Sequence, residues 1–300
     1  MKVLITGGSG FIGRHIVMEC RNRGWETVSF DTAKKNSDSD KHVTGTVLDF
    51  RLLKESMRGC DAAFHLAATT SPPQFEVPGN SGYEINVMGT YNIFQASLEM
   101  GLRKVVFASS SAIYGNMTSA TGEGSVPENY ENIYPVTKRI NEITARFFSS
   151  RIETVALRYF NTYGIGENSK AQYASVVWRF IKALQSGTCP EIYGDGRQSR
   201  DFIYVEDTAR ASVLAMERGK NGEAYNIGTG VSTSFNEIYS IVKEETHSSV
   251  APKYVPNPLK NYQYFTQADM GKARRDLGFV PNHDLRLGIR KMIHADSRST

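Results

Sequence analysis

Short apolar runs rich in β-branched residues alternate with longer amphipathic segments over the first half of the chain. Apolar runs without alternating polar residues are typical of strands that are covered on both faces. Such strands are expected at Lys2–Thr6, Thr27–Asp31, Ala62–Leu66, Lys104–Ala108 and Thr154–Arg158. The segments between them are long enough to cross from one parallel strand to the next. The pattern therefore predicts repeated βαβ units.

Helices are expected between these strands, where apolar residues recur at helical spacing. The predicted helices are Phe11–Arg23, Arg51–Met57, Ile85–Met100 and Pro135–Ser149. Polar or Pro/Gly-rich stretches at Lys34–Lys41 and Ser71–Ser81 are expected to form surface loops. Strands that alternate with helices in this way indicate an α/β fold, a doubly wound parallel sheet of the Rossmann type.

The alternation of strands and helices becomes less regular after about residue 162. A helix is expected near Tyr173–Ser186 and a further strand at Ala224–Ile227. We therefore predict a Rossmann domain over residues 1–162, to which part of residues 203–240 returns. The remainder, mainly residues 163–300, is expected to form a smaller, discontinuous α/β lobe. A chain of 300 residues is long enough for two such units.

Composition narrows the classes of partner. The 35 Lys and Arg and 31 Asp and Glu residues leave a net charge of +4, too small and too dispersed for a nucleic-acid-binding protein. No apolar run is long enough to span a membrane and no signal-peptide pattern opens the chain, so a cytoplasmic protein is expected. The three Cys and six His residues lack metal-ligand spacing, so we expect buried thiols and no metal centre.

A glycine-rich segment, Gly7–Gly13 with the sequence GGSGFIG, follows the first predicted strand and precedes a helix. A strand, a glycine-rich turn and a helix in this order are typical of a dinucleotide-binding site. Gly8 is expected to form the tight turn and Gly10 to let the backbone approach a pyrophosphate at the helix amino terminus. Gly13 is expected to allow close packing of the helix on the strand. A purely structural turn is the alternative.

Asp31 lies at the end of the second predicted strand, near the usual offset for a carboxylate that binds the adenosine ribose. This position favours NAD over NADP, although Lys34 and Lys35 could accommodate a 2′-phosphate. Asp49 and Phe50 follow a further short strand, expected between Asp31 and Asp49, and are candidates for contact with adenine. Asp49 is equally suited to cap a helix.

Tyr134 and Lys138 form the second informative pattern. Pro135 suits the first turn of a helix, and a spacing of four residues places the phenol and the ammonium on one face. A phenol has a pKa of about 10, and lowering it to near 7 requires roughly 4 kcal/mol of phenolate stabilisation. A neighbouring ammonium and the positive end of the helix could supply it. The alternative is a surface Tyr with Lys138 bonded to Glu142.

Three serines, Ser109 to Ser111, close the fourth predicted strand at the edge where open α/β sheets bind ligands. The motifs TGGSGFIG (6–13), HLAA (65–68), SSSAIYG (109–115), YPVTK (134–138) and RYFNTYG (158–164) can be read together. With them, the sequence resembles the extended short-chain dehydrogenase/reductase family, and within it the nucleotide-sugar epimerases and dehydratases. The resemblance spans nearly the whole chain.

The resemblance implies a catalytic role for three residues. Tyr134 would be the acid and base, Lys138 would lower its pKa and bind the nicotinamide ribose, and Ser110 would hydrogen-bond the reacting sugar oxygen. The implied cofactor is NAD. Its implied contacts are Gly7, Gly10, Phe11, Ile12, Gly13, Asp31, Asp49, Phe50, Leu66, Ala67, Ala68, Asn86, Tyr134, Lys138 and Tyr159.

The resemblance also implies a set of substrate contacts. They are Ser110, Ser111, Asn161, Lys170 and Arg200. Arg200 would bind the diphosphate of a nucleotide-sugar, because its planar guanidinium can contact phosphate oxygens bidentately. A helix cap is the alternative for Asn86, an Asx turn for Asn161 and a solvated lysine for Lys170. A second phosphate-binding Arg of the family is replaced here by the segment 258–263.

The reaction is suggested by one departure from the family. Its 4,6-dehydratases carry an Asp-Glu acid/base pair where Ser111 and Ala112 stand here. This difference favours an epimerase over a dehydratase. His65–Ala68 resembles the 4-epimerase version of its loop, so the resemblance favours a UDP-glucose/UDP-galactose 4-epimerase that acts through a transient 4-keto intermediate. The implied partner is a UDP-sugar, from family frequency, and the implied assembly is a homodimer.

Two other functions are considered. An ADP-glycero-manno-heptose 6-epimerase is the alternative enzyme, because Phe265–Asp269 and Lys170 resemble that family. A catalytically silent NAD-binding module is disfavoured, because Ser110, Tyr134 and Lys138 are all present.

Overall fold

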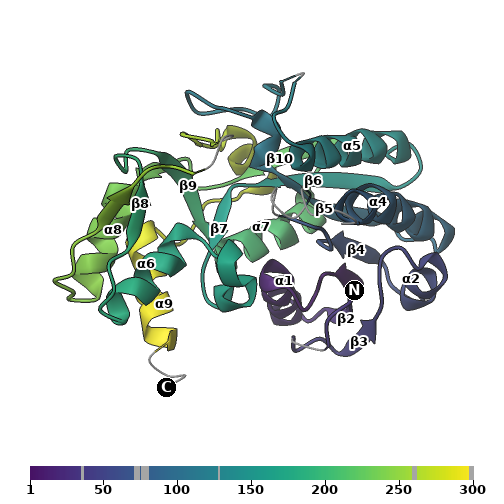
Figure 1. Ribbon diagram of the computed structural model, residues 1–300. Helices are drawn as coiled ribbons and strands as arrows, with labels where there is room; N and C mark the ends of the chain where they lie inside the picture. The colour runs from purple at the N-terminus through teal and green to yellow at the C-terminus, as the bar shows by residue number, and fades with distance from the viewer. Residues whose placement is uncertain (35–36, 71–74, 76–80, 128, 259–261, 297–300) are drawn as a thin grey trace.

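A seven-stranded parallel sheet forms the centre of the computed structural model, which describes residues 1–34, 37–70, 75, 81–127, 129–258 and 262–296 (Figure 1). The strand order is β10-β6-β5-β4-β1-β2-β3, and every neighbouring pair is parallel. The strands are β1 (Lys2–Thr6), β2 (Glu26–Asp31), β3 (Lys41–Thr44), β4 (Ala62–His65), β5 (Lys104–Ser110), β6 (Glu153–Tyr159) and β10 (Glu223–Ile227). The predicted α/β class and doubly wound sheet are confirmed.

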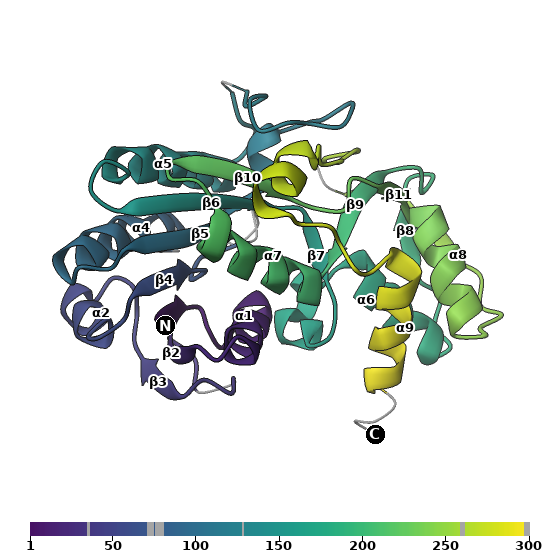
Figure 2. The same cartoon turned by 180° about the vertical axis from the view of Figure 1, so that it is seen from behind.

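Helices cover both faces of this sheet (Figures 1 and 2). They are α1 (Phe11–Asn22) and α7 (Val205–Arg218) on one face, and α2 (Phe50–Ser56), α4 (Gly82–Glu99) and α5 (Ile133–Phe148) on the other. Val3 and Leu4 are neighbours in β1 and are both fully buried, but they belong to two different cores. Successive side chains of a strand point to opposite faces, so a sheet covered on both faces produces continuous apolar runs.

The start of α5 is set by a local cap. The side chain of Asn132 accepts a hydrogen bond from the N–H of Tyr134 at 3.2 Å, and Pro135 lies in the first turn. This start places Tyr134 near the amino terminus of α5, beside the ends of the strands. The predicted loop Lys34–Lys41 ends where β3 begins, and the predicted loop Ser71–Ser81 lies outside the described residues except for Phe75 and Ser81.

The second half of the chain forms smaller sheets beside the main one (Figure 2). A three-stranded sheet contains β7 (Asn161–Tyr163), β9 (Ser199–Tyr204) and β11 (Ser232–Ser234), and a two-stranded sheet contains β8 (Glu191–Tyr193) and β12 (Lys253–Val255). Their helices are α6 (Val176–Gln185), α8 (Phe235–Glu245) and α9 (Leu285–Asp296). The chain also returns to the main sheet, because α7 packs against α1 and β10 pairs with β6.

Three global features bear on function. No helix in the described ranges is both long and apolar enough to cross a membrane. Within those ranges, no three or more His, Cys, Asp and Glu side chains are grouped to hold a metal ion. Cys20 and Cys60 are buried as predicted, whereas Cys189 is exposed, so the prediction of a buried thiol is wrong at that position.

Candidate active site

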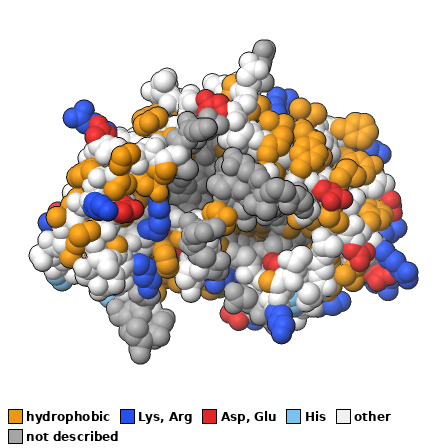
Figure 3. All heavy atoms as spheres, in the orientation of Figure 1, with side chains coloured by type: hydrophobic (Ala, Val, Ile, Leu, Met, Phe, Trp, Pro, Cys, Tyr) orange, Lys and Arg blue, Asp and Glu red, His pale blue; other side chains and the backbone are white. Residues whose placement is uncertain are grey.

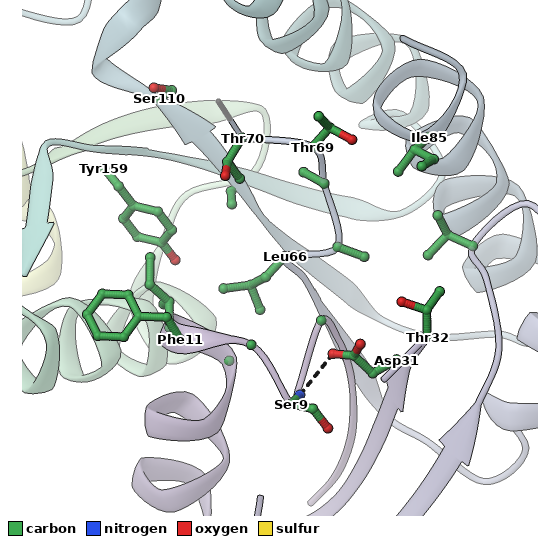
Figure 4. A pocket seen from close by; sticks show the side chains of 18 of the residues that line it. Ser9, Phe11, Asp31, Thr32, Leu66, Thr69, Thr70, Ile85, Ser110 and Tyr159 are labelled. Carbon is green, nitrogen blue, oxygen red and sulfur yellow. Dashed lines mark hydrogen bonds between the residues drawn. The ribbon is translucent and has the colours of Figure 1, made fainter. Parts of the chain in front are cut away.

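A cavity of about 770 Å³ opens at the carboxyl edge of the main sheet. Strand order reverses between β1 and β4, which is where doubly wound sheets bind their ligands. Figure 4 shows Asp31 and Ser9 joined by a hydrogen bond, and Phe11 and Tyr159 lying in another part of the same cavity. The predicted site residues that line it are Gly7, Gly10, Phe11, Ile12, Gly13, Asp31, Leu66, Ala67, Ala68, Ser110, Tyr134, Lys138, Tyr159 and Lys170.

The glycine-rich loop places the start of α1 against this cavity. Gly7 has a φ of +69°, so the tight turn lies at Gly7 and not at Gly8 as predicted. Gly8 instead faces Ser29, whose Oγ would lie 2.5 Å from an added Cβ. A Cβ on Gly13 would lie 2.0 Å from the carbonyl oxygen of Gly7, so the predicted close packing is present. No larger residue fits there.

The amino terminus of α1 has the features of an anion site. The helix begins after Gly10 without a side-chain cap and without an acidic residue in its first turn. Its first N–H groups and the positive end of its dipole therefore remain available to a ligand. A pyrophosphate fits this position on both charge and hydrogen bonding.

Asp31 is fixed beside the glycine-rich loop. One carboxylate oxygen accepts a hydrogen bond from the N–H of Ser9 at 3.0 Å, and the other accepts one from the N–H of Ala33 at 3.0 Å. The carboxylate retains further lone pairs for ribose hydroxyls, and its negative charge disfavours a 2′-phosphate. Lys34 is exposed and is not among the cavity residues, and Lys35 lies outside the described residues.

Asp49 and Phe50 do not line the cavity. Asp49 caps α2 by accepting a hydrogen bond from the N–H of Leu52 at 3.0 Å, so the capping alternative describes its role in the structure. The cavity wall after β3 is formed instead by Gly45, Thr46 and Val47. The sequence analysis missed this segment, although it directly follows a strand that ends at the same edge of the sheet.

The structure brings Ser110, Tyr134 and Lys138 together from β5 and α5. Lys138 Nζ donates a hydrogen bond to the carbonyl oxygen of Ala108 at 3.0 Å and lies 5.9 Å from the centroid of the Tyr134 ring. Ser110 ends β5, and its Oγ accepts a hydrogen bond from the N–H of Ala112 at 3.1 Å. All three side chains line the cavity.

The electrostatics of this group differ from the sequence-based expectation. Burial raises the pKa of Tyr134, and a hydrogen bond with Ser110 acts in the opposite direction. Burial also lowers the pKa of Lys138 to about 8. Lys138 is bonded to a backbone carbonyl, so the expected depression of the Tyr134 pKa is not present in this structure.

The alternative in which Lys138 bonds to Glu142 is also wrong. Glu142 forms two hydrogen bonds with the guanidinium of Arg158, at 2.8 and 2.7 Å, and accepts one from Ser109 Oγ at 2.7 Å. Both Glu142 and Arg158 are almost fully buried. The pair links α5 to β6, and the hydrogen bond from Ser109 links it to β5.

Asn86 lies within α4 and neither caps the helix nor lines the cavity. Its Oδ1 accepts a hydrogen bond from the N–H of Thr69 at 2.8 Å, and its Nδ2 donates to the carbonyl of Thr69 and to Thr137 Oγ1, each at 3.0 Å. Thr69 belongs to the cavity wall that follows β4. Asn86 therefore connects this wall to α5.

Two aromatic side chains, Phe11 and Tyr159, and the charged side chain of Lys170 also line the cavity. Lys170 Nζ lies 4.0 Å from the ring centroid of Phe11 and forms an ion pair with the buried carboxylate of Glu167 at 3.0 Å. Tyr159 OH lies 2.8 Å from Ser212 Oγ, and burial raises the pKa of Tyr159.

The remaining predicted substrate residues lie outside the cavity. Ser111 is buried in the 3-10 helix Ser111–Tyr114, and Asn161 Oδ1 accepts a hydrogen bond from Thr266 Oγ1 at 3.4 Å. Arg200, in β9, is buried between aromatic rings, with its guanidinium 5.1 Å from the Tyr262 centroid and 5.9 Å from that of Phe235. Burial lowers the pKa of Arg200.

No acidic side chain among the described residues forms an ion pair with Arg200. A buried cation that packs against rings in place of a carboxylate is suited to an anionic ligand, because an incoming phosphate would supply the missing counter-charge.

Residues 3–228 match the model of the NAD dependent epimerase/dehydratase family. The chain is 34% identical over 302 residues to the putative UDP-glucose 4-epimerase of Methanocaldococcus jannaschii, covering 97% of each protein. It is 32% identical over 316 residues to the UDP-N-acetyl-alpha-D-glucosaminuronate decarboxylase of Bacillus cytotoxicus, covering 97% of this chain and 96% of that protein.

A solved structure of a related enzyme has the same fold over the whole length of this chain. The UDP-glucose 4-epimerase of Thermotoga maritima, solved with UDP-glucose, superimposes with a TM-score of 0.91 at 30% identity, covering 100% of this chain and 99% of that one. These relatives are named for different reactions of UDP-sugars. The comparisons therefore indicate an enzyme that modifies nucleotide-sugars, but they do not distinguish epimerisation from decarboxylation.

Proposed function

Because the chain belongs to the NAD dependent epimerase/dehydratase family, as its motifs predicted, we propose that it is an NAD-dependent 4-epimerase of a UDP-hexose such as UDP-glucose or UDP-galactose. One observation carries the proposal. Ser110, Tyr134 and Lys138 line the same cavity as the glycine-rich loop Gly7–Gly13, and the two residues after Ser110 are Ser111 and Ala112, neither of which is an acid.

The cavity fits a dinucleotide. The uncapped start of α1 would bind the pyrophosphate, Asp31 the adenosine ribose, and Lys138 the nicotinamide ribose. Leu66 and Tyr159 would form walls beside the nicotinamide. Bound NAD would supply a hydride acceptor that returns the hydride to the opposite face of the same carbon.

Tyr134 would move the proton. Its phenol oxygen would take the proton from the sugar C4 hydroxyl and give it back at the end of the cycle, while Ser110 Oγ hydrogen-bonds the same sugar oxygen. Burial raises the pKa of the Tyr134 phenol, so Tyr134 needs nearby positive charge to act as a base. The Lys138 ammonium, 5.9 Å from the Tyr134 ring centroid, and the amino terminus of α5 would supply it when the phenolate forms.

The lack of a second acid/base group at the cavity favours epimerisation over dehydration. A dehydratase needs a second acid/base group to eliminate water. Among the described residues that line the cavity, Asp31 is the only carboxylate, and both of its oxygens accept hydrogen bonds from backbone N–H groups. Ser111 and Ala112 occupy the positions of the family's acid pair. A decarboxylase would need a cation for the sugar carboxylate, but Lys170 is already paired with Glu167.

An ADP-heptose 6-epimerase is the second candidate, because Lys170 lines the same cavity as Tyr134. The test is a panel of UDP-, GDP-, dTDP- and ADP-sugars incubated with the purified protein without added cofactor. We expect epimerisation of UDP-glucose and UDP-galactose. Epimerisation of ADP-heptose alone would support the second candidate, release of carbon dioxide from a UDP-sugar acid would support a decarboxylase, and no conversion of any sugar would support the silent module.

We also propose that a second copy of the chain covers the exposed face of α4 and α5. Met88 and Tyr91 on α4, and Ile143 and Phe147 on α5, are between 42% and 67% exposed. Apolar side chains gather over this region of the surface (Figure 3). An apolar face of this kind is typical of protein interfaces, and a two-fold axis would let the same face bind its copy.

A further inference from the structure

His65 is a buried titratable side chain that the proposed mechanism does not use. It ends β4, is only 4% exposed, and directly precedes the cavity-lining segment Leu66–Thr70. Its two ring nitrogens contact two fully buried threonines. Nδ1 lies 2.8 Å from Thr6 Oγ1, and Nε2 lies 3.0 Å from Thr90 Oγ1.

The direction of these hydrogen bonds follows from the other partners of the threonines. Thr6 Oγ1 accepts hydrogen bonds from the N–H groups of Leu66 and Ala67, at 3.2 and 3.3 Å. Its own proton is therefore left for His65 Nδ1, which must be the acceptor. Thr90 donates its proton to the carbonyl oxygen of Asn86 at 2.6 Å, so His65 Nε2 must carry the proton that Thr90 Oγ1 accepts.

Only one protonation state satisfies both ends. A proton on Nδ1 would point at a hydroxyl oxygen that already has two N–H donors and would leave the Thr6 proton without an acceptor. The imidazole is therefore neutral, with its proton on Nε2. Burial and the neighbouring Lys138 lower the pKa of His65 to about 3, which agrees with this state.

The hydrogen bonds that run from Thr6 through His65 and Thr90 to Asn86 hold the cavity wall Leu66–Thr69 at both of its ends. Thr6 binds the N–H groups at the start of the wall, and Asn86 binds both the N–H and the carbonyl of Thr69. Asn86 Nδ2 also donates to Thr137 Oγ1, which in turn donates to the carbonyl of Tyr134 at 2.7 Å. His65 and Thr90 join these two ends.

We propose that His65 is a positioning residue, which as a neutral Nε2–H imidazole links Thr6 to Thr90 and so fixes the wall Leu66–Thr69 relative to the turn of α5 that carries Tyr134. The inference rests on the proposed function for its consequence, because this wall is where the cofactor is expected to bind. Both ring nitrogens are used, so His65 itself takes no part in proton transfer to the substrate.

The protonation state is tested by nitrogen NMR of the protein labelled with ¹⁵N-histidine, with the His65 signals assigned by their loss in His65→Asn. We expect an unprotonated Nδ1 and a protonated Nε2. The opposite tautomer or a charged ring at neutral pH would overturn the inference.

The positioning role is tested on the holo protein by the rate at which bound NAD is released. Thr6→Val keeps the shape of the side chain but removes the hydroxyl, so we expect release about five- to tenfold faster. Thr6→Ser keeps the hydroxyl and should restore the slow rate. Thr154→Val is the matched control, because Thr154 is also buried in a strand of the main sheet and donates one hydrogen bond, to the carbonyl of Ala145 at 3.2 Å.

The control separates positioning from stability. Thr154→Val should lower the melting temperature without changing NAD release. If Thr6→Val releases NAD no faster than Thr154→Val, the positioning role is wrong while the proposed function stands. If the wild-type protein holds no NAD, the proposed function fails, and the ring spectrum alone decides the inference.

Discussion

At the scale of single residues, the proposed reaction depends on whether Tyr134 can act as a base. Tyr134 lies in the first turn of α5, is buried, and lines a cavity together with Ser110 and Lys138. Burial stabilises the neutral phenol, and the chain's positive groups act in the opposite direction once they face the phenolate. The balance between these two effects decides whether Tyr134 can act as a base.

Tyr134→Phe should lower turnover by a factor of about 10²–10⁴ and leave NAD in place, because it removes the proton-transferring oxygen but keeps the ring. Steady-state rates together with the NAD content of the purified variant check both parts. A variant that keeps more than about a tenth of the wild-type rate would remove Tyr134 from the mechanism.

His65 predicts a pH dependence of stability. Its pKa is lowered to about 3 in the folded protein and is about 6.5 when the chain is unfolded. Between these values the unfolded state binds a proton that the folded state does not, so stability falls as the pH falls through about 6.5. From pH 7 to pH 5 we expect the wild type to lose about 2 kcal/mol more than His65→Asn in urea unfolding. Parallel losses in both proteins would contradict this.

At the scale of elements, the site depends on how α5 is held against β5 and β6. Arg158 in β6 and Glu142 in α5 form a buried ion pair, and Ser109 in β5 donates to the same carboxylate. Arg158 Nη1 also donates to Tyr114 OH at 2.9 Å and to the carbonyl of Glu123 at 2.7 Å. The buried Glu142 carboxylate therefore joins the helix that carries Tyr134 to the strand that carries Ser110, and Arg158 joins that carboxylate to β6.

Arg158→Met should destabilise the protein by about 3–5 kcal/mol, because it leaves the Glu142 carboxylate buried without its counter-charge. Arg158→Met combined with Glu142→Leu removes both charges and should be less destabilised than Arg158→Met alone. Urea unfolding of the three proteins checks the order. A double variant that is no more stable than Arg158→Met would contradict this prediction.

At the scale of the whole molecule, the exposed faces of α4 and α5 form one apolar surface. Tyr91 and Phe147 each pack against the buried ring of Phe148, with centroids 5.8 and 5.3 Å away, so the apolar residues of the two helices are continuous. The spacings of three and four residues within each helix place them on one side.

Phe147→Asp should convert a dimer into a monomer, because it introduces a charge into this apolar face at a side chain that is 67% exposed. Leu287→Asp on α9 is the matched control, since Leu287 is an exposed apolar helix residue elsewhere on the surface. Sedimentation velocity measures the assembly of both variants. A monomeric wild type, or a monomeric Leu287→Asp, would contradict the role of the α4 and α5 face.

The sequence predicts much of this molecule, because apolar runs, helical periodicity and the glycine-rich turn are local signals. Short motifs predict that Ser110, Tyr134 and Lys138 share a site, and the three side chains line one cavity, while their catalytic roles stay predictions. Asp49 was ambiguous because a carboxylate before a helix serves equally as a cap. The His65 and Arg158 networks could not be predicted, because their partners come from strands and helices far apart in the sequence.

Hydride return within one bound cofactor is the central claim, and isotope retention tests it most directly. UDP-galactose carrying deuterium at C4 is incubated with the purified protein without added NAD, and the product is examined by NMR. The account predicts UDP-glucose that keeps the deuterium at C4, because the hydride leaves and returns without exchange with water. Loss of the deuterium to solvent, or the absence of any UDP-glucose, would contradict the account.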